Sequence, residues 1–61
     1  MKKYRIYYSI YKHGTDDINN SIIVNSVEDD YEILKLGRKQ ITKKESVLSQ
    51  NVSITKISPL I

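Results

Sequence analysis

The sequence of 61 residues contains no cysteine, tryptophan or phenylalanine, and only one histidine, one proline and two glycines. Without cysteine, neither a disulfide nor a thiolate metal site can form, and a single histidine excludes a His-rich metal site. The lack of cysteine also fits a reducing compartment. We therefore expect a small domain that is held together by its core and uses no cofactor.

Long apolar runs are also absent. No run approaches the ~20 apolar residues that cross a bilayer. The start Met-Lys-Lys, followed by alternating Tyr and Ile, lacks the apolar core of a signal peptide. A chain this short forms a single domain and buries only ~60% of its unfolded surface. We expect one soluble, cytoplasmic domain over residues 1–61 that does not contact membranes.

The strongest β signal is Tyr4–Tyr11, in which four of eight residues are Tyr and two are Ile. Alternation gives it an apolar face and a polar, aromatic face that carries Arg5, Tyr7 and Tyr11. The spacing predicts a first strand over about Lys3–Lys12, in the centre of a small sheet. The polar run 13–17 predicts a hairpin loop, and β-branched residues predict a second strand over 21–25. His13, Asp16 and Asp17 are favoured as turn residues over metal ligands.

A helix follows the second strand. Ser26 is expected to be its N-cap, acids occupy the first turn, and bases follow. A period of 3.6 places Val27, Tyr31, Leu34 and Ile41 on one apolar stripe, with Arg38 inside it. Gly37 either lets the helix approach the sheet or marks a kink. The helix is expected to end between about Lys44 and Ser49, with Thr42 as the alternative.

The last strand is predicted over Asn51–Ser58. Ile57 is out of step with Val52 and Ile54, and a bulge or an edge twist would reconcile them. Pro59 is expected to end the strand. The predicted fold is α+β, ββαβ, with a three-stranded antiparallel sheet in the order 2-1-3 and one helix on one face. Ile6, Leu34 and Ile54 are expected to be buried together.

Two patterns of surface residues indicate candidate functions. An open sheet face and a spare apolar helix face could bind protein, and a Tyr/Arg face with a Lys stripe could bind nucleic acid. Either pattern also suits an ordinary solvated surface. The protein-binding candidates are Ile33, Leu36, Ile23, Tyr7 and Tyr11. The nucleic-acid-binding candidates are Arg5, Tyr7, Tyr11, Lys35, Arg38, Lys39 and Lys43.

The chain carries no Ser-His-Asp arrangement, P-loop or glycine-rich phosphate cradle, and we expect no enzymatic activity. Its start Met-Lys-Lys-Tyr-Arg-Ile-Tyr-Tyr and its Ile/Lys/Asn/Ser/Tyr-rich usage resemble the short accessory proteins of phages and mobile elements of low-GC Gram-positive bacteria. That class includes anti-CRISPR and other anti-defence inhibitors. The resemblance implies a non-enzymatic inhibitor that binds a host protein or protein–nucleic-acid complex, and it assigns no role to any one residue.

Many inhibitors of that class are acidic DNA mimics, whereas this chain has a formal net charge of +3. The alternative function is therefore a basic nucleic-acid-binding module. A homodimer that buries the open faces is compatible with either function.

Overall fold

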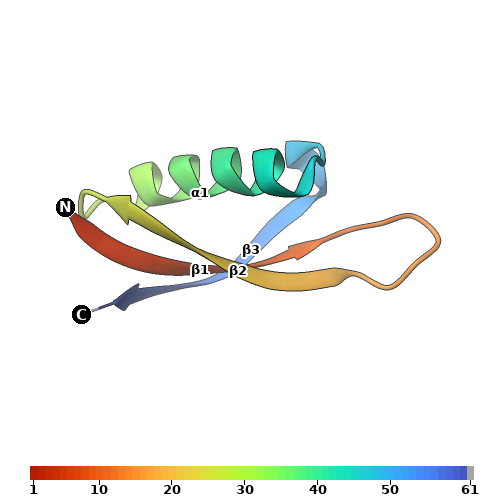
Figure 1. The fold of residues 1–61 in the computed structure, drawn as a ribbon, viewed down its shortest axis with the longest axis horizontal. Coiled ribbons are helices and arrows are strands. Elements are labelled where there is room, and N and C mark those ends of the chain that lie inside the picture. The colour runs from red at the N-terminus through yellow and green to blue at the C-terminus, as the bar shows by residue number, and fades with distance from the viewer. Residues whose placement is uncertain (61) are drawn as a thin grey trace.

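The computed structural model describes residues 1–60, which form one sheet and one long helix (Figure 1). The elements in chain order are β1 (Lys2–Ile10), β2 (Ile18–Ser26), α1 (Asp30–Glu45), the 3-10 turn η1 (Ser49–Asn51) and β3 (Val52–Leu60). The strand order is β2-β1-β3, and β1 pairs antiparallel with both neighbours. The ββαβ prediction and its strand order are confirmed.

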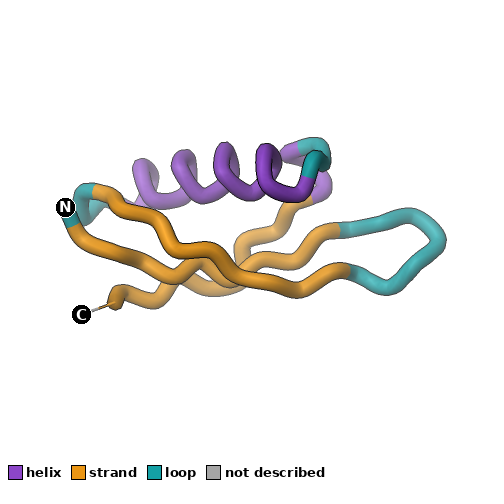
Figure 2. Tube along the Cα trace, in the orientation of Figure 1, coloured by secondary structure: helices purple, strands orange, loops and turns teal. Residues whose placement is uncertain are grey.

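Two layers make up the molecule, because α1 lies along one face of the sheet and no other described element lies on the opposite face (Figure 2). The β1–β2 hairpin extends past the end of the helix, and the domain measures 39 × 17 × 16 Å along its principal axes (Figure 1). The sheet therefore keeps one face without cover, as the sequence indicated.

The core lies between β1 and α1. Alternation in β1 directs Tyr4, Ile6, Tyr8 and Ile10 toward the helix, and all four are buried. The remaining buried apolar side chains come from the other elements: Val24, Ile33, Ile41 and Val52.

Tyr8 is the polar anchor of this core. Its hydroxyl donates a 2.6 Å hydrogen bond to the Glu45 carboxylate at the end of α1. Burial, followed by the hydrogen bond and negative charge of Glu45, raises the pKa of Tyr8 from 10.0 to about 12. Glu45 breaks the apolar period of the helix, and this contact with the central strand gives a reason for it.

A β-bulge lies in β3, where the pairing with β1 shifts between Tyr7 and Tyr8. The extra residue, Thr55, returns Ile57 to the helix side of the sheet, so of the two predicted alternatives, a bulge or an edge twist, the bulge is observed. The prediction that Pro59 ends the strand is wrong, because Pro59 lies opposite Tyr4 and the strand continues to Leu60. An edge strand tolerates proline where the missing N–H would face solvent.

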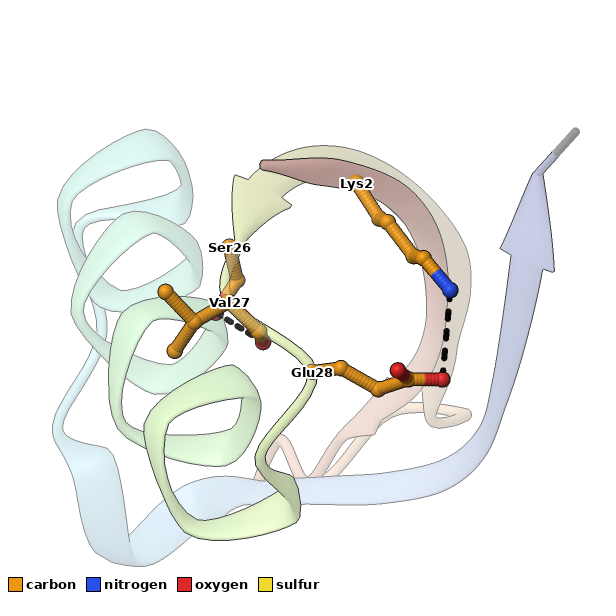
Figure 3. Close-up of polar contacts among 4 residues, drawn as sticks. All are labelled: Lys2, Ser26, Val27 and Glu28. Atoms are coloured by element: carbon orange, nitrogen blue, oxygen red, sulfur yellow. Dashed lines mark hydrogen bonds and ion pairs between the residues drawn. The ribbon is translucent and has the colours of Figure 1, made fainter.

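The N-cap of α1 is Asp29, so the prediction of Ser26 is wrong. The Asp29 carboxylate accepts from the Tyr31 N–H at 2.9 Å. Ser26 is instead the buried last residue of β2, and its hydroxyl donates to the Val27 carbonyl at 3.0 Å (Figure 3). Ser and Asp both make good N-caps, and Asp29 serves here because it immediately precedes Asp30, the first residue of the helix.

The helix packs through a different face from the predicted one. Ile33, Gly37 and Ile41 are buried, whereas Tyr31 is 69% exposed and Leu34 is 38% exposed. Gly37 explains the difference, because a Cβ built there would lie 2.5 Å from Ile6 Cδ1. The glycine therefore marks the closest approach of helix to sheet, and the larger apolar residues flank this contact. Val27 precedes the helix and is also exposed.

The expected core trio is corrected accordingly. Ile6 is fully buried, but Leu34 is exposed and Ile54 is only partly buried. The helix ends at Glu45, inside the predicted range, and Ser46 takes a left-handed conformation with φ 56° at the C-cap.

Candidate binding surface on the open sheet face

The face of the sheet opposite α1 is named here the open face. In antiparallel pairing, residues directly opposite one another point to the same side of the sheet. The register therefore assigns the open face to Lys3, Arg5, Tyr7 and Ser9 of β1, Asn19, Ser21, Ile23 and Asn25 of β2, and Ser53, Lys56, Ser58 and Leu60 of β3.

Charge on the open face has one sign. Lys3, Arg5 and Lys56 are basic, and none of the seven acidic residues belongs to this face. The acids lie in the hairpin loop, in the β2–α1 connection, and on α1. Because nearby acids do not neutralise the three bases, the open face is electrostatically suited to an anionic or acidic surface.

An aromatic residue lies on the open face beside one of these bases. Tyr7 is 37% exposed, and Lys56 Nζ is 5.8 Å from the centroid of its ring, within cation–π range. Arg5, opposite Ile23, has a buried Nε without a hydrogen-bond partner. Ile23 is half exposed and gives the face an apolar contact beside its charges.

The structure brings Arg5, Tyr7 and Ile23 together, as the open-face prediction requires. Tyr11 is exposed but follows the end of β1, where its N–H donates to the Asn51 carbonyl at 2.9 Å. The sheet itself therefore presents one aromatic residue on this face.

The predicted apolar helix face is wrong at Ile33. This side chain is 2% exposed, because the helix turns it toward the sheet beside Gly37. Leu36 is partly exposed, but Ile33, which was expected beside it on the same exposed face, is not. The exposed apolar residues of α1 are instead Tyr31 and Leu34, and Leu34 lines a shallow hollow with Ile54 and Ile57 of β3.

The lysine stripe lies on the other side of the molecule. Lys35, Lys39 and Lys43 are all exposed, and their positions on the helix lie opposite the buried stripe. Arg38 does not belong to this stripe, since its Nη1 donates to the carbonyls of Ser49 at 3.1 Å and Val52 at 2.9 Å. The predicted nucleic-acid set is thus split between two opposite surfaces.

Leu60 and Ser58 complete the open face next to β1, and sequence reasoning missed Leu60 because the strand was expected to stop at Ser58. The signal that could have found it is Pro59 itself, since proline occurs at outward-facing positions of edge strands. Lys2 contributes nothing to this face. Its side chain points to the helix side and pairs with Glu28 at 3.3 Å (Figure 3).

The hairpin loop is exposed at His13, Asp16 and Asp17. Within residues 1–60, no three His, Asp or Glu side chains gather closely enough to hold a metal ion. In the same part of the chain, no helix combines the length and apolar character needed to cross a membrane.

Comparisons with protein-family models, curated proteins and solved structures found no match.

Proposed function

We propose that this chain is a small, non-enzymatic binding protein whose open face docks on an acidic surface of another protein. The observation that carries the proposal is the row of Lys3, Arg5 and Tyr7 along β1, with Lys56 beside Tyr7 and without an acid, on a sheet face that no described element covers. Arg and Tyr are favoured at protein interfaces because they combine contact area with directional hydrogen bonds.

A protein is preferred to a nucleic acid as the partner for two reasons. The cation–π contact with Lys56 occupies Tyr7, so a base could stack on that ring only after displacing the ammonium group. Ile23 and Leu60 also add apolar contacts on either side of β1. A mixed basic and apolar surface suits a protein interface with an acidic rim.

The resemblance to phage and mobile-element accessory proteins supports the finer part of the proposal. On this view the chain is an anti-CRISPR or other anti-defence inhibitor. Its target is a host defence or nucleic-acid-processing protein, or the complex of such a protein with nucleic acid. Its place of action is the cytoplasm of the host cell. Enzymes that handle nucleic acids carry acidic clusters that bind metal ions, and the open face would complement such a cluster.

The test is affinity capture from a lysate of a low-GC Gram-positive bacterium, with mass spectrometry of the retained proteins. The variant Lys3→Glu/Lys56→Glu reverses two open-face charges. The matched control, Lys35→Glu/Lys39→Glu, makes the same change in net charge on the opposite surface. We expect the open-face variant to lose a specific partner that the control retains. Equal capture by both variants would contradict the proposal.

The second candidate function is nucleic-acid binding through the lysine stripe, which is favoured by the exposure of Lys35, Lys39 and Lys43 on one side of α1. Three phosphate contacts would give a log–log salt slope of roughly −2 to −3. Titration of labelled single- and double-stranded oligonucleotides at two salt concentrations measures this slope. Micromolar binding at physiological salt, lost when all three lysines are substituted, would make this the better function.

A further inference from the structure

The outer strands β2 and β3 each have one edge that no other described strand pairs with. Along a strand of an antiparallel sheet, the backbone N–H and C=O of one residue point toward the strand on one side, and those of the next residue point toward the strand on the other side. Two contacts determine the alternation in β1. The Tyr7 carbonyl accepts from Thr55 Oγ1 at 3.2 Å, and the Tyr11 N–H donates to the Asn51 carbonyl at 2.9 Å. The backbone N–H and C=O of odd-numbered residues in β1 therefore point toward β3, and those of even-numbered residues point toward β2.

The backbone groups on the free edge of β2 follow from this alternation. They belong to the partners of the odd-numbered residues: Asn19, Ser21, Ile23 and Asn25. The Ser21 N–H bears this out, because it donates to Asn20 Oδ1 at 2.8 Å. A side chain of the neighbouring residue satisfies this N–H because no strand does.

The free edge of β3 is obstructed. Pro59 lies opposite an even-numbered residue, Tyr4, so the donor it lacks belongs to the outer edge. The bulge at Thr55 interrupts the spacing of the outward groups. A two-fold pairing about the middle of the strand would also place Lys56 against its own copy. Proline, a bulge and a central lysine are the features that protect edge strands from pairing.

The free edge of β2 has none of these protections, and a pairing strand would have to displace only Asn20 Oδ1 from the outward Ser21 N–H. The strand Ile-Asn-Asn-Ser-Ile-Ile-Val-Asn-Ser contains no charge, proline or glycine over nine residues. A strand edge without charge, proline or bulge is a template on which a further strand can pair. Acidic residues occur only beyond its two ends, at Asp16 and Asp17 and at Glu28 and Asp29.

We propose that two copies of this chain pair through antiparallel β2 strands about a two-fold axis at Ile22, forming one six-stranded sheet. This register uses all nine residues of the strand and matches outward-facing residues with one another. Across the axis, Ile22 faces Ile22, Ser21 faces Ile23, Asn20 faces Val24, Asn19 faces Asn25, and Ile18 faces Ser26. The two Asn19–Asn25 pairs can exchange amide hydrogen bonds, and no position sets like charges against each other.

A second copy fits this edge because the strand is self-complementary in that register. The two-fold axis is perpendicular to the sheet, so both helices lie on one side and both open faces lie on the other. The two β1 strands would be about 14 Å apart, three strand spacings. If the proposed function holds, the dimer presents the bases of both copies as one surface, although pairing through β2 does not depend on that function.

Sedimentation equilibrium from micromolar to millimolar protein tests the pairing. We expect a monomer–dimer equilibrium in which salt favours the dimer. The charged residues that approach one another between the copies are the acids beyond the strand ends, and salt screens their repulsion. Ser21→Pro removes an outward donor but no hydrogen bond to β1, so the fold should persist. It should weaken the dimer by on the order of tenfold to a hundredfold, since each copy loses one inter-copy hydrogen bond. Ser21→Ala keeps the donor and should dimerise like the parent.

Amide hydrogen exchange gives a second readout that does not depend on any variant. The amides of Asn19, Ile23 and Asn25 should exchange more slowly as concentration rises, whereas those of the β3 edge should not change. A parent that remains monomeric at millimolar concentration would overturn the proposal. So would a dimer in which these three amides are unaffected. Ser21→Pro keeps all the bases of the open face, so partner capture by this variant tests the proposed function separately.

Discussion

Two core tyrosines on the same face of β1 differ in what their hydroxyls contact. Tyr8 donates to the Glu45 carboxylate, whereas the buried Tyr4 hydroxyl has no hydrogen-bond partner. A hydrogen bond to a charged group contributes about 1.5–3 kcal/mol, and an unsatisfied buried hydroxyl costs about 1–3 kcal/mol. One substitution, Tyr to Phe, should therefore have opposite effects at the two positions.

We expect Tyr8→Phe to lower the free energy of unfolding by about 1.5–3 kcal/mol and Tyr4→Phe to raise it by about 1 kcal/mol. Urea denaturation of the two variants and the parent at neutral pH measures both values. The two positions serve as controls for each other, because each change removes one hydroxyl from a buried ring. Equal losses at both positions would show that the Tyr8–Glu45 contact adds nothing.

The raised pKa of Tyr8 also predicts a pH dependence. At pH below 10.0, its ordinary value, the hydroxyl is protonated in the folded and unfolded chains, so its contribution to stability is complete. Between 10.0 and about 12, the unfolded chain releases the proton while the folded chain keeps it, so stability falls as pH rises. One unit of pKa corresponds to about 1.4 kcal/mol, and because the Tyr8–Glu45 contact is only partly buried, solvent screening keeps the full loss to about 1–2 kcal/mol.

The measurement is the difference in unfolding free energy between the parent and Tyr8→Phe across this range of pH. All other ionisable groups are common to both proteins, so the difference isolates Tyr8. We expect the difference to shrink as pH rises through the alkaline range. A difference that stays constant from neutral to strongly alkaline pH would refute the coupling of this proton to folding.

At the scale of elements, the approach of α1 to β1 depends on Gly37. Its position opposite Ile6 leaves no room for a Cβ, because Ile6 Cδ1 would be 2.5 Å away and Ile6 is completely buried. The next atoms, Ile54 Cδ1 and Ile6 Cγ2, are both 3.7 Å away and make ordinary contact. A single methyl group of the central strand therefore decides whether alanine is tolerated.

A double-mutant cycle tests this contact. Gly37→Ala gains about 1 kcal/mol of helix propensity but should be destabilising overall by about 1–3 kcal/mol through overpacking. Ile6→Val removes Cδ1 and should cost about 0.5–1.5 kcal/mol alone. In the Ile6→Val background, Gly37→Ala should become neutral or stabilising, a coupling of at least about 1 kcal/mol. Additive effects would mean that another contact sets the distance between helix and sheet.

The same contact explains which parts of the fold the sequence predicts well. Strand β1, its faces and the bulge near Ile57 follow from period-two alternation, which depends only on side chains that are large and apolar. The helix face does not follow in this way, because its central residue has no side chain. Counting apolar residues favours Tyr31 and Leu34, whereas the packing is centred on Gly37.

The open face was predictable for a related reason. A ββαβ order leaves one sheet face without a helix, and parity then assigns Arg5, Tyr7 and Ile23 to it. The charge pattern of that face was less accessible, because Lys56 reaches it only after the bulge, beside the ring of Tyr7. The β2 residues on the open face are also those whose backbone groups lie at the free edge of this outer strand, so the proposed binding surface and the proposed pairing edge share residues.

For the molecule as a whole, the free energy contributed by one buried side chain is comparable to the entire free energy of unfolding. Domains gain roughly 0.05–0.15 kcal/mol per residue, so a chain of 61 residues has on the order of 3–9 kcal/mol. Ile41 is completely buried in the centre of the core. Truncation of such a residue to alanine costs about 2–5 kcal/mol, because contacts are lost and a cavity remains.

We therefore expect Ile41→Ala to unfold much of the protein at physiological temperature, whereas Leu34→Ala, at a position 38% exposed, should cost less than about 1 kcal/mol. Thermal unfolding followed by circular dichroism compares the two variants directly. Both substitutions lie in α1 and remove aliphatic side chains of the same size, so the difference in stability between the two variants reports which face of the helix packs on the sheet. If Leu34→Ala were the more damaging change, the helix would face the sheet through the stripe of Tyr31 and Leu34. Gly37 would then have no role in the packing.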